Sequence, residues 1–228
     1  MKRPLSFLFL LMFGCAAFPL GAQSFFSALD YSLRGSILVF PEDNGNASGP
    51  MPILPSLGGS ASFALNDLLA LELSLDIYAH DYDYDYNLNR VVPADQEFRT
   101  SFIIGSILGL QPVFRFRPWG KNITIRAYGG LSFDLRICLS AFDAKGPHQS
   151  DDNKSLTEVS GDIFSYMWGG GRWFFPHAGG GMDFAFLENM TLGFDVRVWF
   201  PVWRLWTGED LPPIEGFRFG LGFRATFK

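Results

Sequence analysis

The sequence has few charged residues for its hydrophobic content. Charged residues make up 18% and hydrophobic residues 48% of the 228 residues, whereas a soluble domain normally carries about 25% charge. Beyond the N-terminal region there is no run of the roughly 18 to 20 apolar residues that a membrane-spanning helix needs. The formal net charge of −5 argues against a nucleic-acid-binding protein, which would carry a basic patch. Disorder is excluded as well, because 17% of the residues are aromatic.

The N-terminal segment has the pattern of a processing signal. Two basic residues precede an apolar stretch over 5–18 that is too short to span a membrane, and small residues end at Ala22. We therefore expect a signal peptide over 1–22 and a mature domain over 23–228. Lipoprotein processing at Cys15 and a short membrane anchor are the alternatives.

Cysteine is scarce, with two residues in the chain. Cys15 would leave with the signal peptide, so the mature domain keeps Cys138 alone. One thiol cannot form an intramolecular disulfide, which excludes a disulfide-stapled secreted scaffold. Cys138 has no histidine close in sequence, and we expect it to be a small residue within a strand.

The sequence does contain repeated stretches in which apolar and polar residues alternate, the pattern of a β-strand. In 69–79, leucine, isoleucine and alanine occupy every second position, and Glu72 and Asp76 lie on the other face. Pro112 predicts a bulge or an early strand end. The eight predicted strands are 29–39, 57–65, 69–79, 102–116, 122–139, 174–186, 190–200 and 217–227.

The connections between these strands are alternately long and short. The short ones are 66–68, 118–121 and 188–189, and the long, polar ones are 41–55, 81–98, 140–170 and 203–213. Short turns on one side and long loops on the other are typical of outer-membrane barrels. An even number of strands also returns both termini to the side of the short turns.

The charged residues determine which strand face meets lipid. An arginine on the lipid face at mid-bilayer costs about 2 to 4 kcal/mol, so the charged face must point into the barrel. The apolar stripes are about 9 to 12 residues long, as a tilted membrane strand requires, whereas soluble strands have about 5 or 6. We therefore predict an all-β fold, an eight-stranded antiparallel transmembrane up-and-down β-barrel, rather than a soluble β-sandwich. The predicted ionic network of its lumen comprises Glu72, Asp76, Arg126, Asp134, Arg136, Asp195, Arg197 and Arg218.

Three stretches resemble those of the small outer-membrane barrel family, the OmpA-like and OmpW-like eight-stranded barrels. They are the strand, Asn-Asp turn and strand over 58–73, the glycine-rich strand over 177–184, and the C-terminal stretch over 222–227. The resemblance implies a bacterial outer membrane and insertion by the barrel-assembly machinery. It also implies a C-terminal assembly signal made of Gly222, Ala225 and Phe227, although Lys228 displaces the aromatic residue from the last position.

An eight-stranded barrel has just enough room for its own side chains. We expect a structural or surface-display protein whose long loops, above all 140–170, contact an extracellular ligand or host molecule. Its other partners would be outer-membrane lipid and the barrel-assembly machinery, and not nucleic acid. The alternative is a narrow OmpW-like channel that passes small hydrophobic molecules through a lateral gate at Pro176 and Pro201. The simpler explanation of these prolines is that the strands end there.

An enzyme is the third class of function, and the sequence gives it little support. His148 and Ser150 stand together in a polar loop rather than at the membrane face, and His80 and His177 have no serine beside them in the sequence. The acidic run over 81–85 lacks the glycine and glutamate that a calcium loop of the EF-hand type requires. We therefore expect no catalytic site, no metal and no cofactor.

Overall fold

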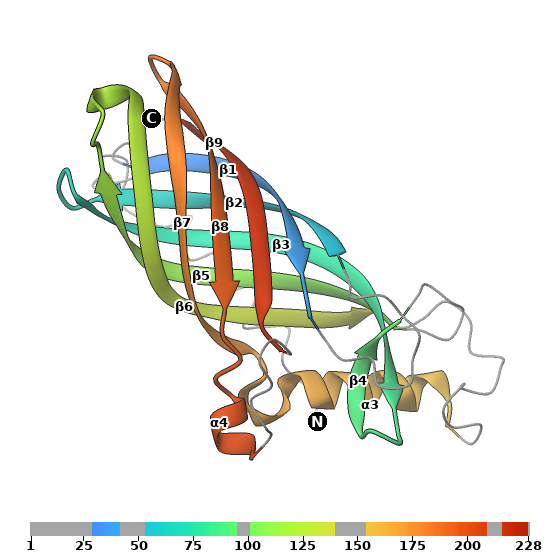
Figure 1. The fold of residues 1–228 in the computed structure, drawn as a ribbon. Helices are drawn as coiled ribbons and strands as arrows, with labels where there is room; N and C mark the ends of the chain where they lie inside the picture. Colours follow the sequence, from blue (N-terminus) through green and yellow to red (C-terminus); the bar gives the residue numbers. More distant parts are fainter. Residues whose placement is uncertain (1–28, 42–52, 95–100, 140–153, 209–215, 228) are drawn as a thin grey trace, which may run out of the picture.

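The computed structural model describes residues 29–41, 53–94, 101–139, 154–208 and 216–227. The predicted signal peptide, with the alternative processing site at Cys15, lies outside these residues. Most of the described chain forms eight long strands, whose arrangement can be followed in Figure 1. They are β1 (Leu29–Val39), β2 (Ile53–Ala64), β3 (Leu69–Asp85), β5 (Ser101–Phe116), β6 (Ile123–Leu139), β7 (Phe174–Leu187), β8 (Met190–Trp199) and β9 (Arg218–Phe227).

These strands form one closed antiparallel barrel. Each strand pairs with the next long strand along the chain, and β1 pairs with β9 to close the sheet. The prediction of an eight-stranded up-and-down barrel is therefore confirmed. The largest differences from the predicted bounds are in β2, which begins at Ile53 rather than Leu57, and in β3, which continues beyond Ala79 to Asp85.

The turn after β2 shows how the sequence sets the strand connections. The side-chain oxygen of Asn66 accepts hydrogen bonds from the backbone N–H groups of Leu68 and Leu69, both at 2.8 Å. An asparagine side chain that binds the backbone two residues ahead replaces a missing backbone bond and stabilises a tight turn. The β5–β6 turn contains a short 3₁₀ helix, η2 (Gly120–Asn122), and Gly120 adopts a φ of 80° there.

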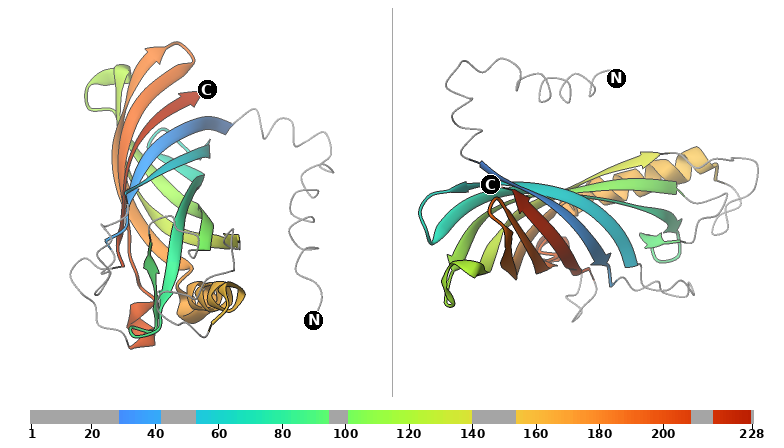
Figure 2. Two further views of the ribbon diagram at one scale, coloured as in Figure 1. Left: turned by 90° about the vertical axis from the view of Figure 1, so that its right-hand side faces the viewer. Right: turned by 90° about the horizontal axis from the view of Figure 1, so that it is seen from above.

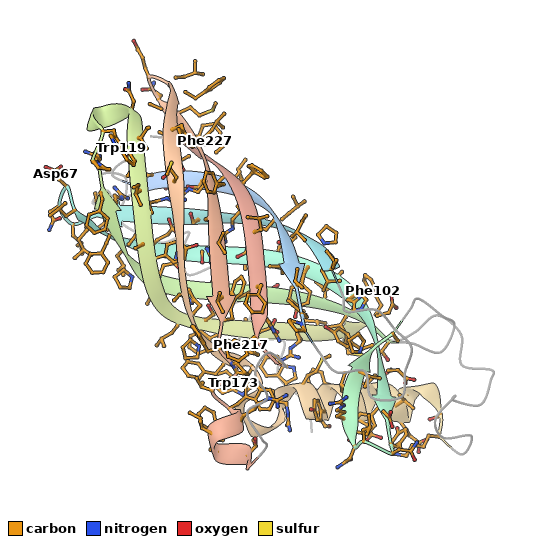
Figure 3. All side chains as sticks on the ribbon, in the orientation of Figure 1. Asp67, Phe102, Trp119, Trp173, Phe217 and Phe227 are labelled. Atoms are coloured by element: carbon orange, nitrogen blue, oxygen red, sulfur yellow. The ribbon has the colours of Figure 1, made fainter. Side chains whose placement is uncertain are left out.

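The outer surface of the barrel is apolar, and the charged strand residues point inward. Leu73 and Phe223 are 49% and 74% exposed, whereas Glu72 and Arg224, their neighbours in sequence, are buried. The alternation in sequence thus becomes an apolar outside and a polar inside, the reverse of a soluble sandwich. Figure 3 shows many side chains projecting outward along the length of the barrel.

Aromatic side chains gather at both ends of the barrel, as expected at the two membrane interfaces. Asp67, Trp119 and Phe227 mark the end that carries the short turns, and Phe102, Trp173 and Phe217 lie toward the other end (Figure 3). At this second end Trp173 stacks on Phe133 with ring centroids 5.8 Å apart, and Phe217 contacts Phe200 at 5.7 Å.

The expectation of a bulge or early strand end at Pro112 is wrong. The β5–β6 pairing has the same register on both sides of it, with Leu110 opposite Leu131 and Val113 opposite Tyr128. Proline lacks a backbone N–H and loses one donor of the ladder, but its ring points outward, so the strand continues to Phe116.

The long connections carry further elements beyond the end opposite the short turns, which together we call the cap. The cap comprises the extension of β3 and its hairpin partner β4 (Arg90–Pro93), helix α3 (Leu156–Trp168), the 3₁₀ turn η3 (Gly169–Gly171) and helix α4 (Arg204–Thr207). The left view of Figure 2 shows this group below the barrel strands. In the part of the chain with a described structure, no helix is long and apolar enough to cross a membrane.

Helix α3 corrects the expectation that 140–170 is only a polar loop. Ser155 and Glu158 form a capping box at its first turn, which supplies partners for backbone N–H groups that the helix leaves free. Val159, Ile163 and Met167, spaced four residues apart, are buried in a cluster with tyrosines of β3. The helix therefore forms because its apolar face packs on the hairpin.

The position of the barrel in lipid can be tested by placing a charge on its outer face. We expect Leu73→Arg to lower the free energy of unfolding by about 2 to 4 kcal/mol, because the guanidinium would lie in hydrocarbon. The same change at Leu68, which is 62% exposed in a short turn, should cost less than about 1 kcal/mol. Equilibrium urea unfolding in lipid vesicles measures both, and equal effects would contradict the inferred membrane position.

Candidate functional site

The interior of the barrel contains a network of buried charges. All eight residues of the predicted ionic network point inward and are at most 9% exposed. Three further charged residues, Arg34, Asp183 and Arg224, are buried with them. The network has three layers along the barrel axis.

The middle layer is centred on two carboxylates. Asp76 accepts a hydrogen bond from Arg34 Nε at 2.9 Å and one from Arg197 Nη1 at 3.2 Å. Asp195 lies 3.7 Å from Arg34 and 3.6 Å from Arg197, and it accepts a hydrogen bond from the Tyr128 hydroxyl at 2.8 Å. The charges of two buried arginines and two buried carboxylates thus balance one another.

The layer toward the short turns is built in the same way. Asp183 lies 2.7 Å from Arg126 Nε and 3.6 Å from Arg224 Nε. Arg224 also donates to Glu72 at 3.2 Å, and the amide of Gln111 donates to the same carboxylate at 2.7 Å. Glu72 thus has two partners that reach it from other strands.

The layer below the cap is centred on Asp134. Arg218 Nη1 donates to this carboxylate at 2.5 Å, Arg136 Nε lies 3.0 Å away, and the hydroxyl of Tyr78 donates to both carboxylate oxygens at 3.0 and 3.1 Å. Arg136 also donates to the backbone oxygen of Arg172 at 2.5 Å. This layer therefore connects the barrel interior to the start of the cap.

Neutral polar side chains connect the layers, and one of their contacts corrects the sequence analysis. His177 has no serine beside it in sequence, but its Nδ1 lies 2.6 Å from Ser132 Oγ, and its Nε2 contacts Gln111. The indole N–H of Trp199 donates to the same Ser132 oxygen at 3.2 Å. Ser132 is fully buried, so a lipid ester cannot reach this pair, and it serves packing.

The buried residues that the predicted network omits follow the same alternation. Arg34 and Asp183 occupy inward positions of β1 and β7, so extending the period-two pattern through those weaker strands would have found them. Gln111 and His177 could be placed inside by the same pattern. Their contact, in contrast, joins strands 66 residues apart in sequence, and no sequence signal predicts it.

The two prolines of the predicted lateral gate lie at the cap end of the β7–β8 seam. Pro176 is within β7, and Pro201 follows the end of β8. The seam is paired up to His177 and Trp199, and Phe200 N–H donates to the Pro176 oxygen at 2.9 Å just beyond. The prolines are thus close together, as expected, and the backbone between them is hydrogen-bonded.

The three residues of the predicted assembly signal lie on β9. Gly222 faces the interior, where a Cβ atom would approach Ser36 Oγ to 2.8 Å and Arg34 Cδ to 3.1 Å. Ala225 and Phe227 face outward. The close packing of the barrel interior therefore accounts for a glycine at position 222. Recognition of the three residues by the assembly machinery stays a prediction.

Polar contacts attach α3 to the β3–β4 hairpin and to the barrel end. The carboxylate of Asp162 accepts hydrogen bonds from Tyr86 at 2.8 Å and from Lys154 at 2.7 Å. Ser160 and Ser101 share a hydrogen bond of 2.8 Å between their hydroxyl groups. The hydrogen bond from Lys154 lowers the pKa of Asp162, while burial and the bond to Asp162 raise the pKa of Tyr86 to about 12.

A closed eight-stranded barrel with an apolar exterior, aromatic ends and a charged interior defines the molecule as an outer-membrane β-barrel protein.

Its fold is similar to that of Neisserial surface protein A, with a TM-score of 0.51 at 12% identity over 88% of this chain and 97% of the other. Two other structures match with lower TM-scores. They are the N-terminal barrel of Pseudomonas aeruginosa OprF, with a TM-score of 0.45 at 13% identity over 87% of this chain and 96% of the other, and Yersinia pestis Ail, with a TM-score of 0.47 at 9% identity over 87% and 96%. No protein-family model and no curated protein matches the chain.

The importance of the interior ion pairs can be tested by removing one carboxylate. We expect Asp76→Asn to lower the free energy of unfolding by about 3 to 5 kcal/mol, because Arg34 and Arg197 would keep buried charges without this partner. Asp67→Asn in the exposed turn is the matched control and should stay within about 0.5 kcal/mol. Guanidinium unfolding in lipid vesicles, followed by tryptophan fluorescence, measures both. A loss for Asp76→Asn as small as that expected for the control would show that the interior charges are dispensable.

The attachment of α3 should depend on pH. A carboxylate whose pKa is lowered in the folded state stabilises that state above its ordinary value and loses this effect as the pH falls through the lowered value. Asp162 has this shift, and so does Glu158, through its hydrogen bonds with Ser155. We expect amide protection in α3, corrected for intrinsic exchange, to be constant from neutral pH down to about 4.5, the ordinary pKa of Glu, and to fall at lower pH as first Glu158 and then Asp162 lose their contributions.

Hydrogen exchange of two variants supplies the control for this pH dependence. Asp162→Asn keeps an acceptor for Tyr86 but removes the titrating group, so the loss of protection at low pH should shrink. Adding Glu158→Gln should abolish it. Protection that still falls with pH in the double variant would assign the effect to other groups.

Proposed function

We propose that the protein is a structural barrel of the outer membrane with a filled lumen, whose cap contacts molecules outside the cell. The observation that carries the proposal is the set of ion pairs that cross the lumen. Arg197 on β8 binds Asp76 on β3, four strands away in either direction around the barrel. Because the partners come from opposite walls, the charged side chains occupy the axis along which a solute would pass.

The other layers support the same interpretation. Arg218 on β9 reaches Asp134 on β6, and Arg224 on β9 reaches Glu72 on β3. Between them lies Trp199, which is 2% exposed. A solute would have to separate buried opposite charges and displace this indole, and separating such a pair costs several kcal/mol.

The cap is the part of the molecule that is available for contact with other molecules. The short turns are the periplasmic side in barrels of this layout, so the cap would face outward. Val159 and Ile163 are fully buried, while Phe164, on another side of α3, is 48% exposed. Loops held by a rigid scaffold commonly carry binding functions, and the barrel supplies that scaffold here.

Conductance measurements test the filled lumen. We expect the purified protein to form no large, stable channels in planar lipid bilayers, because its charges pair across the axis. Cells that produce it should take up apolar solutes no faster than cells without it, and Pro176→Ala/Pro201→Ala should change nothing. Stable channels would refute the filled lumen. Uptake that depends on the two prolines would favour the lateral channel for small hydrophobic molecules instead.

Site-directed labelling tests the outward orientation of the cap. In a Cys138→Ser background, we expect a membrane-impermeant maleimide to label Thr157→Cys on intact cells, because Thr157 is exposed on α3. Asp67→Cys in the short turn should react only after the cells are lysed. The reverse pattern would place the cap in the periplasm and refute the display role.

A further inference from the structure

Two large apolar side chains of helix α4 are exposed on the cap. Leu205 is 67% exposed and Trp206 is 57% exposed. We call this pair the α4 patch. Single exposed apolar residues are normal on a protein surface, whereas adjoining ones that continue a larger apolar surface mark a contact with a membrane or a protein.

The α4 patch is held in place by the turn that precedes β7. The indole N–H of Trp206 donates to the backbone oxygen of Gly170 at 2.9 Å. Gly171 has a φ of 79°, and a Cβ atom there would approach Cζ2 of Trp206 to 2.9 Å, so glycine allows the indole to lie close to the turn. The polar group of Trp206 thus has a partner within the protein, and its exposed ring needs no hydrogen bond from water.

The charge nearest to the α4 patch points into the protein. Arg204 is the one charged residue of the segment 200–208, and it is buried. Its Cζ atom lies 5.1 Å from the ring centroid of Trp203, which is buried as well. The exposed side chains of α4 are therefore uncharged, and this surface can enter an apolar environment without desolvating an ion.

The segment that carries α4 leaves the barrel at its lipid-facing surface. Phe200 directly follows β8, is 37% exposed, and lies 5.7 Å from Phe217 between ring centroids. Phe217 stacks on Phe219, which occupies an outward position of β9. Five residues separate Phe200 from Leu205, so the α4 patch begins where this outward aromatic row ends.

The turn on the other side of α4 also leads to the lipid-facing surface. Trp173 follows the glycines that contact Trp206, and it stacks on Phe133, which occupies an outward position of β6. Figure 3 labels Trp173 and Phe217 at the end of the barrel that adjoins α4, and Figure 1 shows α4 beyond the cap ends of β7 and β8. Aromatic rings of the barrel rim thus adjoin the α4 patch along both connections.

The tip of the β3–β4 hairpin provides a contrast within the cap. Leu88 in its turn is 42% exposed. The face that continues the apolar stripe of β3 toward this turn carries Asp81, Asp83 and Asp85, and carboxylates at every second position belong in water. Leu88 is therefore an exposed leucine separated from the membrane by charges, whereas Leu205 is joined to it by aromatic rings.

We propose that the α4 patch binds the bilayer, at the boundary between headgroups and acyl chains of the leaflet at the cap end. Amphipathic segments without exposed charge on one face lie at this boundary. Tryptophan is favoured there because its ring combines a large apolar surface with one polar group. The partner is lipid rather than protein because the patch continues the surface that already faces lipid. The contact ties the cap to the membrane beside β7 and β8.

The inference goes beyond the proposed function. It needs the barrel to lie in a bilayer, but it depends neither on a filled lumen nor on the side of the membrane that the cap faces. Conductance and maleimide labelling test those two properties, whereas quenching by lipid reports whether the α4 patch touches the bilayer. The proposals can therefore fail separately.

Fluorescence quenching of a label at position 205 tests the lipid contact. Leu205→Cys, in a Cys15→Ser/Cys138→Ser background, is labelled with the fluorophore NBD, and the full chain is reconstituted in phosphatidylcholine vesicles. Leu88→Cys in the same background is the matched control. We expect a lipid with a nitroxide near the glycerol end of its acyl chain to quench the label at 205 at least roughly two-fold more than the label at 88. Iodide in the water should show the reverse order.

Two outcomes of the quenching experiment overturn the proposal. Equal quenching of the two labels by lipid and by iodide would mean that the α4 patch faces water. A label at 205 that is shielded from both quenchers would mean that protein covers the patch, either a second copy or another part of this chain.

Hydrogen exchange provides a test without a label. Leu205→Gln makes the patch polar while removing little packing within the protein, because Leu205 is mostly exposed. The amides of Leu205, Trp206 and Thr207 donate to backbone oxygens of 202 and 203. In phosphatidylcholine nanodiscs we expect them to exchange at least roughly three-fold faster in the variant, since a buried leucine would be lost from the bilayer. Leu88→Gln should leave the exchange of its own turn unchanged. Exchange in α4 that does not respond to Leu205→Gln overturns the proposal.

Discussion

The free-energy cost of placing a charge in hydrocarbon is the constraint on which the rest of this structure depends. It requires every arginine and carboxylate of the membrane strands to face the lumen, where burial again demands a partner. Arg197 and Asp76 meet this demand by pairing across the barrel. The same contact crosses the lumen and joins strands of opposite walls.

The cap depends on the barrel in turn. Strand β3 continues past the apolar stripe as a hairpin with β4, and its tyrosines provide the surface on which α3 packs. Asp134 and its two arginines form the boundary between the lumen and the cap. The cap is thus joined to the charged interior of the barrel through this carboxylate and its arginines.

The barrel was predictable from the sequence because each strand displays its own two faces. The alternation around Glu72 and Asp76, together with long and short connections in turn, indicates both the fold and the inward direction of the charges. Helix α3 was missed although Ser155 and Glu158 form a capping box and Val159 begins a buried stripe at helical spacing. That signal is local and short, and the polar residues around it concealed it.

The sequence by itself thus determined the strands, their order and which side chains face lipid, because these properties depend on near neighbours and on a period of two. Only the tertiary structure decided which charges pair. Arg224 and Glu72 are 152 residues apart, and Ser132 meets His177 across 45. Such contacts depend on the registers of all eight strands and on closure by β1 and β9.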